Sequence, residues 1–121
     1  MSRRMERVNA TLQRELGVLI IESLADPRIA MMTSVIDVDT SHDLATAIVS
    51  VSVMGTDEER ANTLAALESA AGYLRRSVED RIKMRHVPRL IFKLDTRIQK
   101  AAEMLAYMDE IERQDRKRRS E

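Results

Sequence analysis

The stretch Ser69–Lys93, SAAGYLRRSVEDRIKMRHVPRLIFK, changes from one hydrophobic period to another and decides the fold class. Its first half places Ala71, Leu74 and Val78 three or four positions apart, the spacing of an amphipathic helix. Near its end a second pattern begins: residues 89–95 alternate apolar and polar side chains, the period of a half-buried strand. Pro88 stands between the two patterns and ends the helix at the latest. A helix followed directly by a strand predicts an α+β protein.

Gly72 interrupts the helical part of this stretch. A glycine inside a helix costs about 1 kcal/mol relative to alanine, so its presence calls for a backbone reason. The helical pattern is also long, from Thr56, which with Glu59 has the spacing of a capping box, to Lys83. We therefore expect two helices that meet at a kink around Ala70 and Gly72 rather than one straight rod.

Two strands and a helix are predicted upstream of this stretch. Residues 3–24 repeat apolar positions at helical spacing, and Asp26-Pro27 ends that helix. Residues 31–39 and 44–54 read as strands, with residues 40–43 as the turn between them. The second strand alternates most clearly, with alanine and valine on one face and threonine and serine on the other. Two strands joined by a short turn predict an antiparallel hairpin.

A last helix is predicted downstream, over residues 96–112. The basic segment 113–121 has no apolar side chain to bury and is expected to be disordered. Residues 1–112 then form one domain with the order α-β-β-α-kink-α-β-α. The economical arrangement is a three-stranded sheet packed against helices.

The charges balance over the whole chain but are segregated along it. Lysine and arginine number 20, as do aspartate and glutamate, so the net charge is zero. Residues 15–59 hold nine acids against one arginine, net −8, whereas residues 71–100 hold nine cations against three acids, net +6. A bipolar molecule can present a basic face to a polyanion while its other side is repelled. The chain has no cysteine and no apolar run long enough for a membrane span, so we expect a cytoplasmic protein without a membrane partner.

The basic residues are the candidate binding site. Lys and Arg supply most of the sequence-independent affinity for nucleic acids by neutralising phosphates. An ordinary solvated helix face with internal ion pairs is the alternative interpretation. Aromatic residues make up only 2% of the chain, so recognition through backbone and shape is favoured over base stacking. The candidate RNA-binding residues are Arg75, Arg76, Arg81, Lys83, Arg85, Arg89 and Lys93, with Arg3, Arg4 and Arg7 from the first helix.

Catalytic and metal chemistry have little support. His42 and His86 are far apart and lack a nucleophile motif. The acids Asp37, Asp39 and Asp43 do not follow the spacing of a calcium loop, and no glycine-rich phosphate loop exists. We expect no enzyme, no cofactor and no metal.

Residues spread along nearly the whole chain resemble one family. They are Asp26-Pro27-Arg28-Ile29, Thr33, Val35, Asp37-Val38, Ser41-His42-Asp43-Leu44, Ala47, Ala70-Ala71-Gly72-Tyr73-Leu74-Arg75, Arg85, Pro88, Leu90, Phe92 and Asp95. In this order and spacing they are similar to ribosome-binding factor A, the bacterial small-subunit assembly factor.

The resemblance implies a type-II KH-like fold in which an Ala-x-Gly helix kink, here Ala70 and Gly72, replaces the usual Gly-x-x-Gly loop. It implies binding to the 30S subunit and its 16S rRNA near the decoding region, during late maturation of the rRNA 5′ end. It further implies a role in cold adaptation and release by an assembly GTPase, and we expect a monomer. Two other functions stay open: a protein-interaction module that uses the acidic region 15–59 or the final helix, and, more remotely, a hydrolase.

Overall fold

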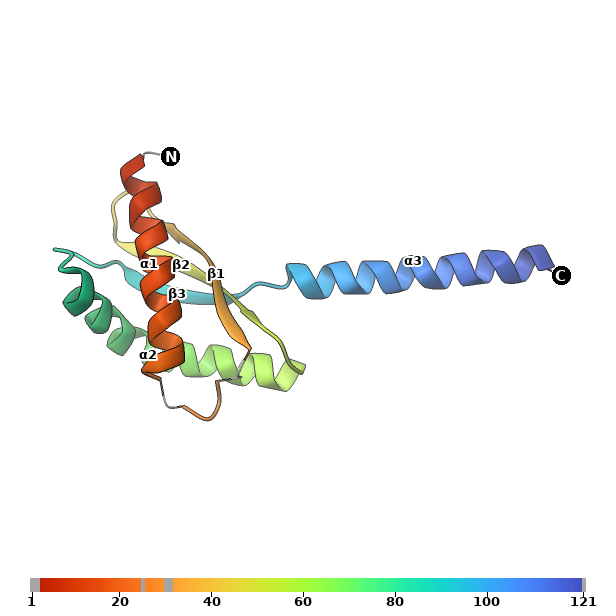
Figure 1. The fold of residues 1–121 in the computed structure, drawn as a ribbon, viewed down its shortest axis with the longest axis horizontal. Coiled ribbons are helices and arrows are strands. Elements are labelled where there is room, and N and C mark those ends of the chain that lie inside the picture. Colours follow the sequence, from red (N-terminus) through yellow and green to blue (C-terminus); the bar gives the residue numbers. More distant parts are fainter. Residues whose placement is uncertain (1–2, 25, 30–31, 121) are drawn as a thin grey trace.

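The predicted hairpin is the first half of a three-stranded sheet. In a computed structural model, which describes residues 3–24, 26–29 and 32–120, β1 (Thr33–Thr40) pairs antiparallel with β2 (Thr46–Val53). The third strand, β3 (Arg89–Leu94), lies parallel to β2, so the sheet order is β1-β2-β3 (Figure 1). The predicted start of the first strand at residue 31 lies outside the described residues.

The turn between β1 and β2 is longer than the sequence predicts. Leu44 was expected to begin the second strand, but its φ of 60° is left-handed and incompatible with a strand. The Ser41 carbonyl accepts a hydrogen bond from the Leu44 N–H at 2.9 Å, and the Asp43 carboxylate accepts from the Ala45 N–H at 3.0 Å. These bonds hold the turn, and β2 therefore begins at Thr46.

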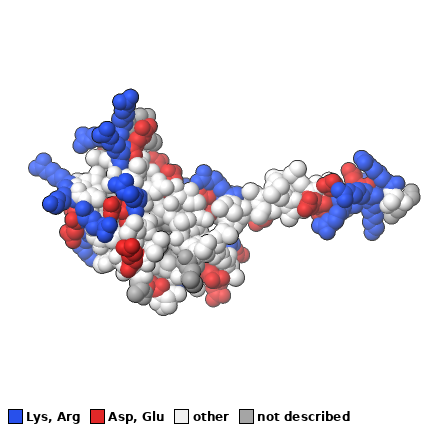
Figure 2. All heavy atoms as spheres, in the orientation of Figure 1, with Lys and Arg blue, Asp and Glu red and all other residues white. Residues whose placement is uncertain are grey.

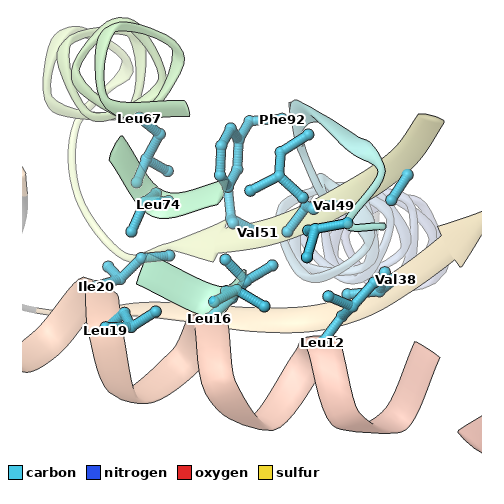
Figure 3. Packing of buried hydrophobic residues seen from close by; sticks show 14 of the residues in the cluster. Leu12, Leu16, Leu19, Ile20, Val38, Val49, Val51, Leu67, Leu74 and Phe92 are labelled. Carbon is cyan, nitrogen blue, oxygen red and sulfur yellow. The ribbon is translucent and has the colours of Figure 1, made fainter. Parts of the chain in front are cut away.

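One face of the sheet carries the core. Ala47, Val49 and Val51 on β2 have no exposed surface, as their alternation predicts. Two helices, α1 (Arg3–Glu22) and α2 (Asp57–Ile82), bury their apolar sides against this face. Figure 3 shows Leu12, Leu16, Leu19 and Ile20 of α1 pointing toward Val38, Val49, Val51 and Phe92, with Leu67 and Leu74 of α2 beside them. The opposite face is partly exposed: Ile48 and Ile91 are each 40% exposed there, whereas Ser50 and Ser52 are buried.

The helix α2 differs from the prediction of two helices. It begins with the predicted capping box, in which Thr56 and Glu59 exchange side-chain-to-backbone hydrogen bonds of 3.0 and 3.1 Å. It then runs without a break to Ile82, so the separation into two helices is wrong. The helix nevertheless changes direction about midway along (Figure 1). A helix that wraps around a core can bend without losing its hydrogen bonds.

The last helix, α3 (Arg97–Ser120), runs beyond the predicted boundary at residue 112. Residues 113–120 are helical rather than disordered, and Glu121 lies outside the described residues. Ion pairs between side chains one turn apart, Arg113 with Glu110 and Arg116 with Glu112, support the extension. The helix projects from the rest of the molecule, and none of its residues is buried (Figure 1).

Candidate nucleic-acid interface

Arg75 is hydrogen-bonded within the protein. Its Nε donates a hydrogen bond of 2.9 Å to the backbone carbonyl of Val87, and the side chain is half-buried. Val87 is fully buried in the connection between α2 and β3. A buried carbonyl needs a hydrogen-bond donor, and the Arg75 guanidinium supplies it. The bond thereby links the connection to α2.

Arg81 is paired within the protein. Its Nε lies 2.6 Å from the Glu15 carboxylate of α1, whose side chain is only 15% exposed. This ion pair joins α1 to the last turn of α2 across 66 positions of sequence. Glu15 largely neutralises the charge of Arg81, so this guanidinium contributes less to attracting phosphates than a free one.

Arg89 and Lys93 lie on the partly exposed face of the sheet. In β3 they alternate with the buried Leu90 and Phe92, so they point away from α1 and α2. Lys93 sits in the same cross-strand row as Asp37 of β1, with Ser50 of β2 between them. The two cations are exposed, but they do not share a surface with the helix cations.

Five of the predicted cations gather at one end of the molecule. Arg3, Arg4 and Arg7 of α1 line a groove of about 470 Å³ whose other wall is formed by Ile82 and Met84, at the C-terminal end of α2. The exposed Lys83 and Arg85 flank Met84 in the chain. Figure 2 shows Lys and Arg side chains over the first half of α1 and this end of α2. We call these five residues (Arg3, Arg4, Arg7, Lys83 and Arg85) the basic end.

The basic end has free charges. Among the residues that the structure describes, no carboxylate lies within ion-pair distance of any of the five side chains. Lys83 is the C-cap of α2, and its left-handed backbone, with φ of 50°, turns the chain out of the helix. After this turn Met84 lies beside α1, where it lines the groove. Sequence reasoning selected all five cations, but missed that residues 3–7 and 83–85 are neighbours.

The Ala70-x-Gly72 motif lies apart from the groove. Ala70 packs partly against the core, whereas Gly72 is exposed and its φ is not positive. The Arg76 side chain folds back over the glycine, with Nη1 3.8 Å from the position of an added Cβ. Arg76 is exposed, and within the described part of the chain it makes no ion pair. It is another unpaired cation among the described residues, on the outer side of α2.

The apolar part of the groove was not predicted as functional. Val8, Ile82 and Met84 are half-buried: each packs partly against the core and also lines the groove. Their helical spacing indicates core positions. That interpretation is correct for the side of each residue that packs against the core, but it misses the side that lines the groove. The partial exposure arises because these side chains line the groove between α1 and the end of α2, and no pattern within one helix reports a groove between two elements.

Acidic side chains with perturbed protonation lie away from the basic end. Hydrogen bonds from the Arg28 side chain hold the pKa of the Asp26 carboxyl below its usual value, and Arg97 acts in the same way on the pKa of Asp95. Both pairs are local Asp-x-Arg turns, with N···O distances of 2.8 and 2.5 Å. They shape the chain before β1 and before α3, and nothing in their geometry indicates proton-transfer chemistry.

The described ranges 3–24, 26–29 and 32–120 contain no group of three or more His, Cys, Asp or Glu side chains placed to hold a metal ion. No helix in them is long and apolar enough to cross a membrane.

Comparison with known proteins gives the family. The family model described as ribosome-binding factor A matches residues 4–108. The chain belongs to the ribosome-binding factor A family. It is 41% identical over 117 residues to the ribosome-binding factor A of Desulforamulus reducens, covering 97% of both chains. It is 39% identical over 115 residues to that of Caldanaerobacter subterraneus, covering 95% of this chain and 94% of the relative.

Solved structures of the family confirm the fold. The crystal structure of ribosome-binding factor A from Thermus thermophilus matches with a TM-score of 0.65 and 31% identity, covering 74% of this chain and 94% of that one. A homology model of the Thermus thermophilus protein, fitted into a cryo-EM map of a 30S–RbfA complex, matches with a TM-score of 0.60 and 32% identity, over 72% of this chain and 90% of that one. The predicted family and the predicted α+β, KH-like fold are therefore confirmed.

Proposed function

We propose that this protein is a non-catalytic assembly factor that binds the 30S ribosomal subunit through its 16S rRNA. The family supports the 30S subunit as the partner, because a member of the family has been fitted into a map of a 30S complex. The observation that carries the proposal in this chain is the basic end. Its five unpaired cations come from two segments that the fold brings together, which is the arrangement that phosphate binding requires.

The finer part of the proposal concerns when the factor acts. We propose that it binds during late maturation, when the 5′ end of the 16S rRNA is processed, and leaves with the help of an assembly GTPase. Such a factor works in the cytoplasm as a monomer. Resemblance to the family supports these steps, and the exposed cations are compatible with the reversible, salt-sensitive binding that release requires.

Co-sedimentation with purified small subunits at several salt concentrations tests the proposal. Replacing Arg4 and Arg7 by Gln removes two of the contacts, so the slope of log affinity against log salt should fall by about 1.5 to 2. The matched control is the pair Arg89→Gln and Lys93→Gln, which removes two exposed charges from the partly exposed sheet face. We expect a clearly smaller change in the control. Equal losses of affinity in both double variants would mean that binding does not use the basic end specifically. An unchanged affinity in the Arg4 and Arg7 double variant would contradict the proposal.

The exposed helix α3 favours a second, protein-mediated contact. Met104, Leu105 and Met108 are 58–66% exposed on a helix that buries none of its residues and that bonds to the sheet near its start, where the Gln99 amide donates to the Val53 carbonyl. Apolar side chains in a continuous exposed stretch are typical of interaction surfaces. If α3 binds a protein, Leu105→Gln, which changes no charge, should weaken co-sedimentation while leaving its salt slope unchanged. If affinity is unchanged, this contact is wrong.

A further inference from the structure

The groove at the basic end combines two kinds of lining. Arg3, Arg4 and Arg7 supply positive charge from α1, while Val8, Ile82 and Met84 supply an apolar surface. Its volume of about 470 Å³ falls in the range of small-molecule sites, which is about 300–1,000 Å³. A duplex presents only phosphates and sugars to such a surface, and its stacked bases cannot reach an apolar floor.

We propose that this groove holds one unpaired nucleotide of RNA, with its base against the apolar floor and its phosphates on the arginines. The inference rests on the proposed function and adds the form of RNA that the site takes. Unstacked bases bind apolar side chains and the planes of guanidinium groups, so arginines can substitute for the aromatic rings that this chain lacks. The Met84 thioether is polarisable and flexible, which suits contact with a base of any identity.

A second groove in the molecule shows why charge decides the occupant. The groove between α1 and β1 has a similar volume, about 410 Å³, and is also largely apolar, with Val18, Ile21 and Val35 in its lining. Its charged side chains are one arginine, Arg14, and one glutamate, Glu22, which balance. Of these two grooves between described residues, only the one at the basic end pairs an apolar floor with uncompensated positive charge, as a nucleotide requires.

The Thr11 side chain offers a way to block the groove. Thr11 lies on α1, lines the groove and is half-buried. Thr11→Met extends an apolar side chain into the space and suits a helix. Ala10 is an exposed neighbour on α1 that does not line the groove, so Ala10→Met is the matched control.

The test measures binding to three RNA hairpins by fluorescence anisotropy at fixed salt. The first contains a one-nucleotide bulge, the second the same bulge without its base, and the third is fully paired. We expect the intact bulge to bind about five- to tenfold more tightly than the other two, the scale of one base contact. Thr11→Met should remove this preference, and Ala10→Met should keep it. The salt slope should stay the same in both variants because neither changes a charge.

Two results would overturn the inference. One is equal binding of all three hairpins by the unmodified protein; the other is a full bulge preference in a folded Thr11→Met protein. If Thr11→Met does not fold, as judged by its thermal melt, Met84→Gln makes the floor polar and should reduce the preference instead. The proposed function is judged separately, because salt-dependent co-sedimentation with 30S subunits persists if only the nucleotide site is wrong. If the unmodified protein shows no bulge preference and Thr11→Met nevertheless loses 30S binding, the groove is assigned to a protein partner and the nucleotide is rejected.

Discussion

Gly72→Ala should stabilise the protein. If a kink in α2 required the glycine, its replacement would cost up to about 1 kcal/mol, or more with a positive φ. The structure indicates the opposite sign. Gly72 lies within the continuous helix α2, its φ is not positive, and it is exposed. An added Cβ would meet only the Arg76 guanidinium, at 3.8 Å, which is ordinary van der Waals contact with the end of a flexible side chain.

The magnitude follows from helix propensity. With no steric cost, alanine gains the difference between the two residues in a helix interior, about 0.5–1 kcal/mol. In a domain of this size that gain raises the melting temperature by about 2–6 °C. Thermal and urea unfolding followed by circular dichroism would measure it. Gly17→Ala is the matched comparison, because Gly17 is also inside a helix and its added Cβ would meet nothing within 4 Å.

The opposite sign at only one position would refute this reasoning. If Gly17→Ala stabilises and Gly72→Ala destabilises, the bend in α2 depends on the glycine itself, through strain that the local contacts do not reveal. If both variants stabilise, the bend comes from the packing of α2 around the core. Gly72 is then not needed for stability, and a reason to have glycine there must come from the bound state.

Three further predictions concern Arg75, Asp95 and the end of α3. Arg75→Ala removes the donor to the Val87 carbonyl and should destabilise the protein by about 1–3 kcal/mol in urea unfolding, whereas an unchanged stability would mean that water replaces the guanidinium. The lowered pKa of Asp95 contributes stability above its unfolded value of 3.8, which is lost as pH falls through the lower folded pKa; Asp95→Asn should therefore flatten the stability profile below pH 3.8 in acid titrations, and a curve parallel to the original would reject this assignment. Ending the chain after residue 112 should leave the melting temperature within about 1 °C, because α3 buries no side chain; a larger drop would show that residues 113–120 pack against the domain.

Much of the fold could be predicted because its signals are local. The alternation in β2 and β3 and the three-four spacing in α1 and α2 each depend on a few neighbouring residues, and burial follows them closely. The errors also have local causes. The basic segment after residue 112 has nothing to bury, which suggested disorder, but its side-chain ion pairs at helical spacing sustain the helix. In α2, Gly72 suggested a break between two helices, but the helix is continuous from Asp57 to Ile82.

The sequence by itself determined the order of elements, the core positions and the presence of uncompensated cations. Only the tertiary structure decided which of those cations act together. Arg75 and Arg81 are adjacent to the others in sequence, yet one binds a carbonyl 12 positions away and the other a carboxylate 66 positions away. Arg89 and Lys93 fall on the far face because a strand alternates across a sheet. Arg3, Arg4 and Arg7 join Lys83 and Arg85 because two helix ends meet. Charge is a property of the chain, but a binding surface depends on distances between elements that no local pattern contains.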